Sequence, residues 1–178
     1  VANVITSAGG DRITDVDAGA VEGIAITSVN NGNGTWRYST DGGSTWFDVG
    51  SVSSISALLL RANDYISYVG NGQNGGTADF QFRAWDQTSG TQGTKVDTSV
   101  NGGTSAFSTA IETAGITSTS VNDAPVLDYT GTMLLTTITE DQITNPGNTI
   151  ASIIASAGGD RIIDVDSGAV EGIAITSL

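Results

Sequence analysis

The chain contains one stretch of sequence twice, and this duplication limits its possible folds more than any other feature. Residues 7–28 and 156–177 align at an offset of 149 residues and differ only at Thr14/Ile163 and Ala18/Ser167. The full alignment covers 29 residue pairs, of which 22 are identical. Such similarity indicates a tandem duplication, so the structural unit is a repeat of 149 residues. We therefore expect the chain to be a window on a longer repetitive protein.

The balance of charged residues excludes several classes of partner. The sequence has 19 acidic residues against 6 basic ones, which gives a net charge of −13. Nucleic acid and anionic membrane surfaces attract basic proteins, so neither is an expected partner. Clustered carboxylates either keep a surface soluble or bind hard cations such as calcium. No apolar run approaches the ~20 residues that a membrane-spanning helix needs.

The residue types that are missing also restrict the chemistry. Without cysteine there is no disulfide framework, so stability must come from packing or from a metal. Without histidine the chain lacks the commonest general base and the commonest ligand of zinc, copper and iron. A serine or threonine nucleophile would have to use Lys95 or a carboxylate as its base, and nothing at motif spacing supports this. We expect a protein that is not an enzyme.

Short segments rich in β-branched or alternating residues, bounded by Gly, Asn and Asp, predict an all-β fold. No segment repeats apolar residues at helical spacing for more than a turn or two. Seven to nine short strands per repeat are typical of a β-sandwich, and residues 40–45 are predicted to close a hairpin. The expected strands are residues 23–29, 35–39, 46–49, 57–61, 65–69, 77–85, 106–121 (one strand or two), 133–139 and 149–155.

The segment Asn122-Asp123-Ala124-Pro125 suggests a boundary, because proline cannot donate to a sheet and restricts the residue before it. We expect a domain over residues 1–121 that lacks its first ~28 residues. A linker over 122–125 and the opening part of the next repeat over 126–178 would follow. Incomplete repeats of one kind could complete each other head to tail by strand donation in a filament. A window cut from a continuous chain is the alternative.

Two acidic pairs recur at the same place in the duplicated stretch, Asp15-Val-Asp17 and Asp164-Val-Asp166. In an extended segment, side chains at i and i+2 point the same way, so the two carboxylates could share one cation. The alternative is a turn in which an aspartate accepts hydrogen bonds from its own backbone.

The order of four short motifs is similar to bacterial cadherin-like repeats, which are calcium-binding sandwich domains strung in tandem in very large secreted adhesins and surface proteins. These motifs are Thr139-Glu140-Asp141, Asp164-x-Asp166-x-Gly, Ala84-Trp85-Asp86 and Val121-Asn122-Asp123-Ala124-Pro125. The resemblance covers essentially the whole repeat. It implies an Ig-like or cadherin-like β-sandwich, an extracellular or cell-surface location, and calcium at the junctions between neighbouring repeats.

The resemblance also implies which residues hold calcium. Asn122, Asp123, Asp164 and Asp166 would serve one junction. Asp15, Asp17 and Asp86 would serve the junction with a preceding domain. The linker has fewer acids than the animal cadherin pattern, and no pair matches its mid-domain Asp-Arg-Glu motif. These departures imply fewer calcium ions per junction, or none.

The segment Ser39–Trp46 (STDGGSTW) resembles the Asp-box of sialidase-type propellers. Its expected role is structural: the aspartate caps a tight hairpin, the glycines permit positive φ, and the tryptophan packs beneath. A propeller would repeat the box every ~40–50 residues, whereas this chain has one. The arginines, at 12, 37, 61, 83 and 161, do not form the cluster that would hold a sialic acid carboxylate. A propeller-type glycosidase is therefore disfavoured.

Aromatic residues leave a second function open. They include Trp36, Trp46, Trp85, Tyr38, Tyr65 and Tyr68. Such residues usually fill the core and edges of a sandwich, but they could form a sugar-stacking platform beside the loop 71–76. The leading hypothesis is a structural or adhesive repeat with calcium-stiffened junctions, whose partners are neighbouring repeats. The alternative is a carbohydrate- or surface-binding module that recognises surface glycans.

Overall fold

The computed structural model describes residues 1–10 and 12–177. The chain divides into two compact units, Val1–Thr119 and Ser120–Leu178. The first unit consists mainly of antiparallel strands, and the predicted all-β class is confirmed at this level. Residues 122–125, the predicted linker, lie at the start of the second unit.

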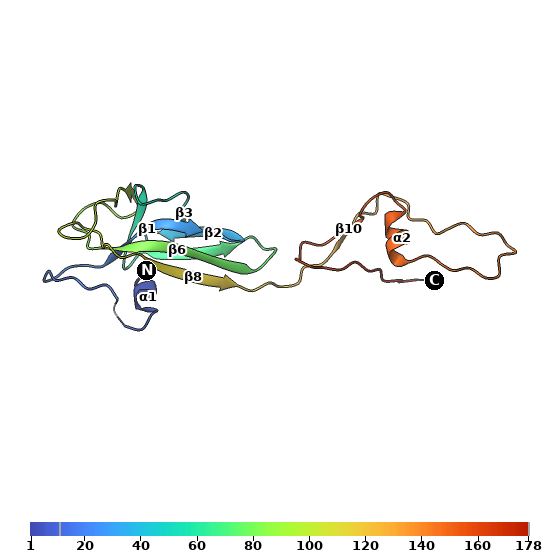
Figure 1. Ribbon diagram of the computed structural model, residues 1–178, viewed down its shortest axis with the longest axis horizontal. Helices are drawn as coiled ribbons and strands as arrows, with labels where there is room; N and C mark the ends of the chain where they lie inside the picture. Colours follow the sequence, from blue (N-terminus) through green and yellow to red (C-terminus); the bar gives the residue numbers. More distant parts are fainter. Residues whose placement is uncertain (11, 178) are drawn as a thin grey trace. The chain divides into compact units, whose positions relative to one another are not determined.

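Two antiparallel sheets make up most of the first unit (Figure 1). One sheet has the strand order β7-β4-β1-β6-β8 and the other has the order β3-β2-β5. A short helix precedes the first strand. The elements are α1 (Ala2–Thr6), β1 (Gly23–Asn30), β2 (Gly34–Ser39), β3 (Phe47–Asp48), β4 (Ala57–Arg61), β5 (Tyr65–Gly70), β6 (Gly76–Trp85), β7 (Lys95–Val96) and β8 (Glu112–Ser118).

Strand β1 lies in the middle of the larger sheet because its residues are apolar on both faces. Ile24 pairs with Leu60 of β4 on one side and with Ala84 of β6 on the other. The side chains of Ile24, Ala25 and Ile26 are all 0% exposed. An uninterrupted apolar run is expected where both faces of a sheet are covered, and β4, with Leu58 to Leu60, has the same character.

Alternate residues of the central strands enter two different cores. The first core lies between the sheets and combines Ile24, Ile26, Leu58, Leu60, Ala78, Phe80 and Phe82 of the larger sheet with Trp36 of β2. Ile5 of α1 joins it. The second core covers the opposite face of the larger sheet and contains Ala25, Ala57, Leu59, Trp85, Ala106 and Phe107. Period-two alternation along β6 therefore separates Phe80 and Phe82 from Trp85, as the sequence predicts.

The turn between β4 and β5 moves the chain from one sheet to the other instead of closing a hairpin. The two strands pair with different neighbours, β4 with β1 and β7, and β5 with β2. Asp64 is 3% exposed, and its Oδ2 accepts a hydrogen bond of 2.7 Å from the Arg61 N–H. The buried carboxylate thus fixes the corner at which the chain changes sheets.

The hairpin between β2 and β3 is held by the side chains of Ser39 and Asp41. The Thr45 N–H donates to Asp41 Oδ1 at 2.8 Å, and the Gly43 N–H donates to Ser39 Oγ at 2.9 Å. Gly42 and Gly43 have φ values of 75° and 90°, which favour glycine. These hydrogen bonds, chiefly the one from the Thr45 N–H, lower the pKa of Asp41 to about 2.

The second unit has little regular structure. It contains β9 (Val126–Leu127), α2 (Ile150–Ala155) and β10 (Ile162–Ile163). Strands β9 and β10 form an antiparallel pair in which Leu127 lies opposite Ile162. Ile154 of α2 is 3% exposed, as is Ile5, its counterpart in α1. The buried isoleucine of the repeated helix is therefore a feature of both copies.

Two strand predictions in the second unit are wrong. The β-branched character of residues 149–155 predicts a strand, but residues 150–155 form α2, which buries Ile154. Thr149 caps this helix by accepting the Ser152 N–H at 3.1 Å. Residues 133–139 form no strand, and Leu134 and Leu135 are 64% and 65% exposed. The expectation that helices are missing also fails for α1 and α2, which are too short to show helical periodicity.

Candidate functional site

The first predicted acidic pair, Asp15 and Asp17, lies in a turn that precedes β1. The Asp17 N–H donates to Asp15 Oδ1 at 2.8 Å, and the Ala20 N–H donates to the Asp17 carbonyl at 3.2 Å. Gly19 follows with a φ of 84°. The segment is therefore a turn closed by an aspartate side chain, not an extended strand, and this is one of the two geometries that the sequence allows.

The second acidic pair, Asp164 and Asp166, is built in the same way. The Asp166 N–H donates to Asp164 Oδ1 at 2.8 Å, and the Ala169 N–H donates to the Asp166 carbonyl at 3.2 Å. Gly168 has a φ of 82°. Because the two copies agree in every one of these contacts, the turn is determined by its own sequence and not by its surroundings.

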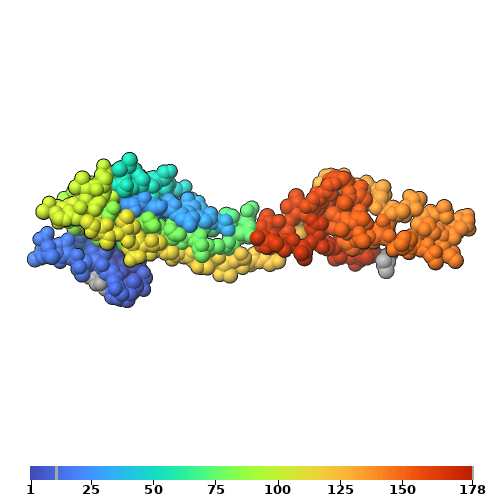
Figure 2. Space-filling model, viewed as in Figure 1, coloured from blue at the N-terminus to red at the C-terminus, as the bar shows by residue number. Residues whose placement is uncertain are grey.

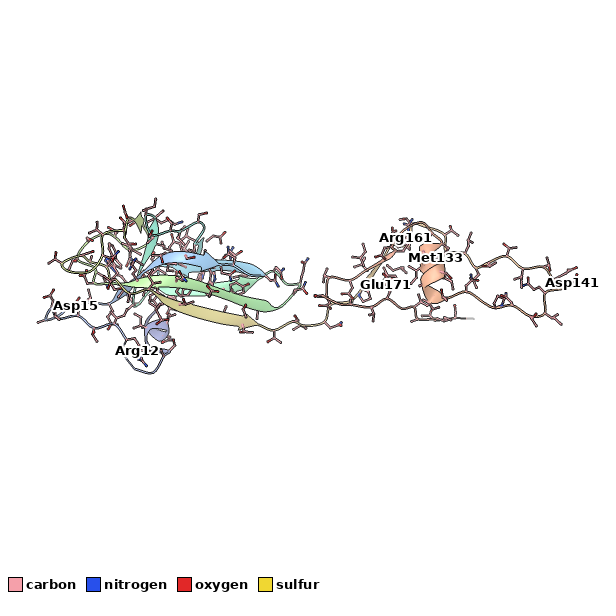
Figure 3. The ribbon with its side chains drawn as sticks, viewed as in Figure 1. Arg12, Asp15, Met133, Asp141, Arg161 and Glu171 are labelled. Carbon is pink, nitrogen blue, oxygen red and sulfur yellow. The ribbon has the colours of Figure 1, made fainter. Side chains whose placement is uncertain are left out.

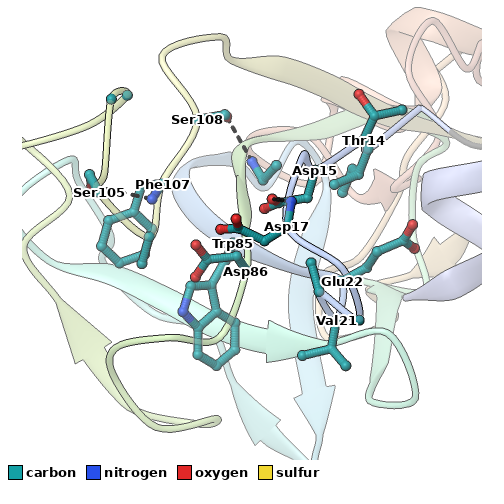
Figure 4. A pocket seen from close by; sticks show the side chains of 17 residues that line it. Thr14, Asp15, Asp17, Val21, Glu22, Trp85, Asp86, Ser105, Phe107 and Ser108 are labelled. Carbon is teal, nitrogen blue, oxygen red and sulfur yellow. Dashed lines mark hydrogen bonds between the residues drawn. The ribbon is translucent and has the colours of Figure 1, made fainter.

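In the first unit, the turn forms one side of a pocket of about 470 Å³ (Figure 4). Asp86 follows the end of β6 and also lines the pocket, as do several residues between 102 and 108. Figure 4 shows the carboxylates of Asp15, Asp17 and Asp86 gathered in one part of the pocket, whereas the carboxylate of Glu22 points away from them. The structure thus brings together the three residues predicted for this site.

The pocket favours a cation on electrostatic grounds. Among the described residues, its lining includes Asp15, Asp17, Glu22 and Asp86 and no lysine or arginine. One oxygen of Asp86 accepts hydrogen bonds from the Thr88 N–H at 2.8 Å and the Thr88 hydroxyl at 2.6 Å. Oδ2 of Asp15 and Oδ2 of Asp86 accept no hydrogen bond from the described residues. Within those residues, however, no group of three or more acidic side chains has metal-binding geometry as it stands.

In the second unit, the acidic turn contacts the segment that precedes β9. The Asp123 N–H donates to Asp166 Oδ2 at 2.8 Å. The Asn122 side chain is directed elsewhere, because its Nδ2 donates to the Asp123 carbonyl at 2.7 Å. The structure therefore connects Asp123 with Asp166 and Asp164, while Asn122 contributes no contact to the pair that the structure records.

A further acidic pair of the second unit, Asp160 and Glu171, was not among the predicted site residues. The negative charge of Asp160 raises the pKa of Glu171 above its ordinary value, and desolvation adds to this. Both residues belong to the duplicated stretch, as Asp11 and Glu22 do in the first copy. Asp11 lies outside the described residues.

The predicted aromatic platform is divided between core and surface. Trp36 and Trp85 are 5% and 1% exposed and belong to the two cores. Trp46 and Tyr65 are 39% and 50% exposed, and their rings meet edge to face at 6.5 Å between centroids. Of the six predicted platform residues, Trp46 and Tyr65 are the exposed ones, whereas Tyr38 and Tyr68 are half-buried. Tyr38 and Tyr68 pack against the first core.

Comparisons of the chain with protein-family models, with curated proteins and with solved structures found no match. Among the described residues, no helix is long and apolar enough to cross a membrane.

Proposed function

We propose that the chain is a non-enzymatic, extracellular repeat unit of a large structural or adhesive surface protein, in which calcium fixes each acidic turn to its neighbouring segment. An Ig-like or cadherin-like sandwich is the proposed fold family. The observation that carries the proposal is the pocket of the first unit, which gathers Asp15, Asp17 and Asp86 with no basic residue in its lining. Oxygen donors of this kind suit calcium, which accepts irregular coordination by carboxylates and carbonyls.

The second acidic turn supports the same role. Asp164 and Asp166 repeat the geometry of the first turn, and Asp123 already reaches Asp166 through its backbone. A calcium ion shared by the Asp123, Asp164 and Asp166 carboxylates would hold residues 120–125 against the turn. Without the ion, the carboxylates repel one another, so the segment would gain freedom. An array of such repeats would then become more flexible when calcium is removed.

Calcium titration by calorimetry on the full chain tests this proposal. We expect binding in the micromolar to millimolar range that is typical of carboxylate sites. Asp164→Ala with Asp166→Ala should remove one set of sites, and Asp15→Ala with Asp17→Ala the other. The matched control is Glu140→Ala with Asp141→Ala, which removes the same charge from an exposed segment outside the turn. No heat at millimolar calcium would contradict the proposal.

Thermal unfolding supplies an independent measurement. Calcium at about 100 times its dissociation constant should stabilise the folded state by about 2.7 kcal/mol. A chelator should reverse this shift. An unchanged midpoint in the presence of chelator would leave the acidic surface with a role in solubility only.

One observation favours a second candidate, a carbohydrate-binding module. Trp46, Phe47 and Tyr65 are 39%, 51% and 50% exposed on the smaller sheet and its hairpin. Exposed aromatic rings can stack on the apolar face of a sugar. A glycan array with the wild-type chain and with Trp46→Ala tests this function. Binding that disappears with Trp46→Ala would support it, and an array without hits would argue against it.

A further inference from the structure

The loop of residues 71–75 joins β5 to β6 at one end of the first unit, where its side chains extend from the ends of the strands (Figure 3). In Figure 2 the residues around position 75, in green, lie at the surface. Asn33 holds both ends of the loop. The Asn71 N–H donates to the Asn33 carbonyl at 2.8 Å, and Asn33 Nδ2 donates to the Gly75 carbonyl at 2.8 Å. Residues 71–73 between these anchors are exposed to water.

The loop begins with an asparagine that is followed by a glycine. The chain has five such pairs, at residues 31–32, 33–34, 71–72, 74–75 and 101–102. Asparagine is a thermolabile residue, and it loses its amide most easily before glycine. The backbone nitrogen of the next residue attacks the side-chain amide, and glycine has no Cβ to hinder this attack. The contacts of the glycine N–H and of the asparagine side chain then decide which pair reacts.

Two of the pairs lie in the turn that precedes β2, and both have an occupied glycine N–H. The Gly32 N–H donates to Asn30 Oδ1 at 3.1 Å. The Gly34 N–H donates to the Asn31 carbonyl at 3.0 Å. A nitrogen held in this way must lose its hydrogen bond before it can attack, so the fold protects these two pairs.

The pair Asn101-Gly102 is protected on both sides. The Gly102 N–H donates to the Phe107 carbonyl at 2.7 Å. Asn101 Nδ2 donates to the carbonyls of Thr98 and Ser99, at 3.2 Å and 3.0 Å. The nucleophile and the leaving group of this pair are therefore both held by hydrogen bonds, which makes it a reference within the same chain.

The pair Asn71-Gly72 is arranged differently. Asn71 Oδ1 accepts the N–H groups of Gln73 and Asn74, at 3.0 Å and 3.2 Å, so the side chain is folded back along the loop. The ring that the first of these hydrogen bonds closes contains both Asn71 Cγ and the Gly72 nitrogen. The Gly72 N–H donates no hydrogen bond to the part of the chain that the structure describes. The nucleophile is thus free, and its target belongs to the same small ring.

The hydrogen bonds to Asn71 Oδ1 also suit the intermediate of the reaction. Attack on Cγ places negative charge on this oxygen, and N–H groups that already point at it stabilise the charge as it develops. Asn71 Nδ2, the group that must leave, donates no hydrogen bond within the described residues. Because the side chain is exposed, water can protonate this group.

We propose that Asn71 is a site of spontaneous deamidation, which proceeds through a succinimide. The Gly72 nitrogen loses its proton to water and forms a bond with Asn71 Cγ. The bond between Cγ and Nδ2 breaks, and Nδ2 takes up a proton and leaves as ammonia. Water then opens the succinimide at either of its two carbonyls and leaves an aspartate or an isoaspartate at position 71. No oxidant, reductant or cofactor takes part.

The two products change the loop in different ways. Both add a carboxylate to a chain whose net charge is already −13. The aspartate can keep the hydrogen bonds from Gln73 and Asn74, because a carboxylate oxygen accepts them more strongly than an amide oxygen does. The isoaspartate carries the backbone through the side-chain carbon, so the loop becomes longer and loses the oxygen that orders it. This inference goes beyond the proposed function and does not depend on calcium.

Mass spectrometry of the folded chain during incubation in warm, mildly alkaline buffer tests the proposal. Trypsin separates positions 71 and 101 into the peptides 62–83 and 96–161, and fragmentation distinguishes position 71 from position 74. We expect position 71 to convert at least about tenfold faster than position 101. In denaturing urea, which removes the contacts that distinguish them, the two rates should agree within about threefold. Equal rates in the folded chain, or an unchanged ratio in urea, would overturn the inference.

The products distinguish cyclisation from direct hydrolysis of the side chain. A succinimide opens to isoaspartate as well as aspartate, whereas direct hydrolysis gives aspartate alone. Fragmentation that breaks the bond between N and Cα identifies isoaspartate, because its backbone contains the extra carbon. We expect both products at position 71. Aspartate alone would overturn the proposed path.

Two variants test the roles of the pair. Gly72→Ala should slow the conversion at position 71 at least about tenfold, because the methyl group hinders the attacking nitrogen. Gly72 has a φ of 77°, which favours glycine, so this change also strains the loop. Asn71→Gln therefore serves as a second variant, since its longer side chain must close a larger ring. Conversion of Asn71→Gln at the wild-type rate would overturn the inference. The control Asn101→Gln should leave the rate at position 71 unchanged.

Discussion

Residues 23–28 and 172–177 have the same sequence, GIAITS, but very different structures. In the first copy these residues form most of β1, where Ile24 and Ile26 are 0% exposed between β4 and β6. In the second copy they form no strand, and Ile173 and Ile175 are 45% and 73% exposed. The acidic turns a few residues earlier, at Asp15–Asp17 and Asp164–Asp166, are nevertheless alike in both copies.

This contrast shows that the turn is determined by residues close together in the sequence, whereas the strand requires partners from distant parts of the chain. The turn depends on hydrogen bonds between residues two or three positions apart, so it forms wherever the sequence occurs. The strand depends on neighbours such as Leu60 and Ala84, which lie far along the chain and pair with β1 on its two sides. Strand propensity is therefore realised only where partners bury the apolar face.

The largest expected difference between the copies comes from Ile26→Ala and Ile175→Ala, the same change at the same place in the repeat. Ile26 is 0% exposed and Ile175 is 73% exposed. We expect Ile26→Ala to lower the free energy of unfolding by about 2–5 kcal/mol, because it leaves a cavity. Ile175→Ala should change it by less than about 0.5 kcal/mol. Urea unfolding followed by circular dichroism measures both, and equal losses would mean that residues 172–177 are buried in solution.

The next contrast concerns Gly23→Ala and Gly172→Ala. An added methyl group at Gly23 would meet Trp85 Cε3 at 2.7 Å and the Leu60 carbonyl oxygen at 2.9 Å, whereas nothing lies within 4 Å at Gly172. We expect a loss of about 1–3 kcal/mol at Gly23 from overpacking and a change below about 0.5 kcal/mol at Gly172. Thermal unfolding distinguishes the two, and a neutral Gly23→Ala would show that β1 can move away from β6.

A third contrast compares Arg161→Gln with Arg12→Gln. Removal of Arg161 takes away one of the groups that stabilise the Asp128 carboxylate, so the pKa of Asp128 should rise from about 2 toward its usual range. The stabilisation that this carboxylate gives is complete above the usual aspartate pKa of about 3.9, and it is lost as the pH falls toward 2. Carboxyl carbon shifts in an NMR titration report the pKa. Arg12→Gln should leave the pKa of Asp128 unchanged. An equal effect of Arg161→Gln and Arg12→Gln would contradict the assignment of the ion pair to Arg161 and Asp128.

The smallest effect is expected for Glu171→Gln. The negative charge of Asp160 raises the pKa of Glu171 in the folded chain. The repulsion between the two carboxylates is therefore absent below the pKa that Glu171 has in the unfolded chain, and it is complete above the pKa that Glu171 has in the folded chain. Glu171→Gln should therefore raise the melting temperature of the second unit slightly at neutral pH and not at pH 3. Both carboxyl groups are near solvent, which keeps the effect small. The control Glu140→Gln should leave the melting temperature unchanged at neutral pH and at pH 3.

The sequence predicts the position of single strands better than it predicts which strands pair with one another. The apolar runs at Gly23–Asn30 and Ala57–Arg61 and the alternation along Gly76–Trp85 predict β1, β4 and β6 nearly to the residue, because burial on one or both faces leaves a clear pattern. The sequence does not reveal that β4 and β5 belong to different sheets, because a short turn with Asp64 suits a hairpin and a crossing equally well.

The second unit shows where such patterns mislead. The segment Thr149–Ala155 is β-branched enough to predict a strand, yet it forms a helix of six residues that buries Ile154 and is capped by Thr149. In the candidate site, the resemblance implies that Asp15, Asp17 and Asp86 serve a junction with a preceding domain, and in the structure all three line one pocket of the first unit. The ion pair of Arg161 with Asp128 was not predicted, because its members are 33 residues apart and match no motif.

The strand order of the larger sheet also has a consequence for the time course of folding. Strand β1 comes first along the chain but lies in the centre, between β4 and β6, and Gly23 pairs with Trp85. During synthesis, this central strand would have to wait until about sixty further residues had emerged, while the hairpin of β2 and β3 closes over a short loop. We expect the nascent chain to keep an apolar strand unpaired for that interval, so that other unfolded chains compete for it before the correct sheet has formed.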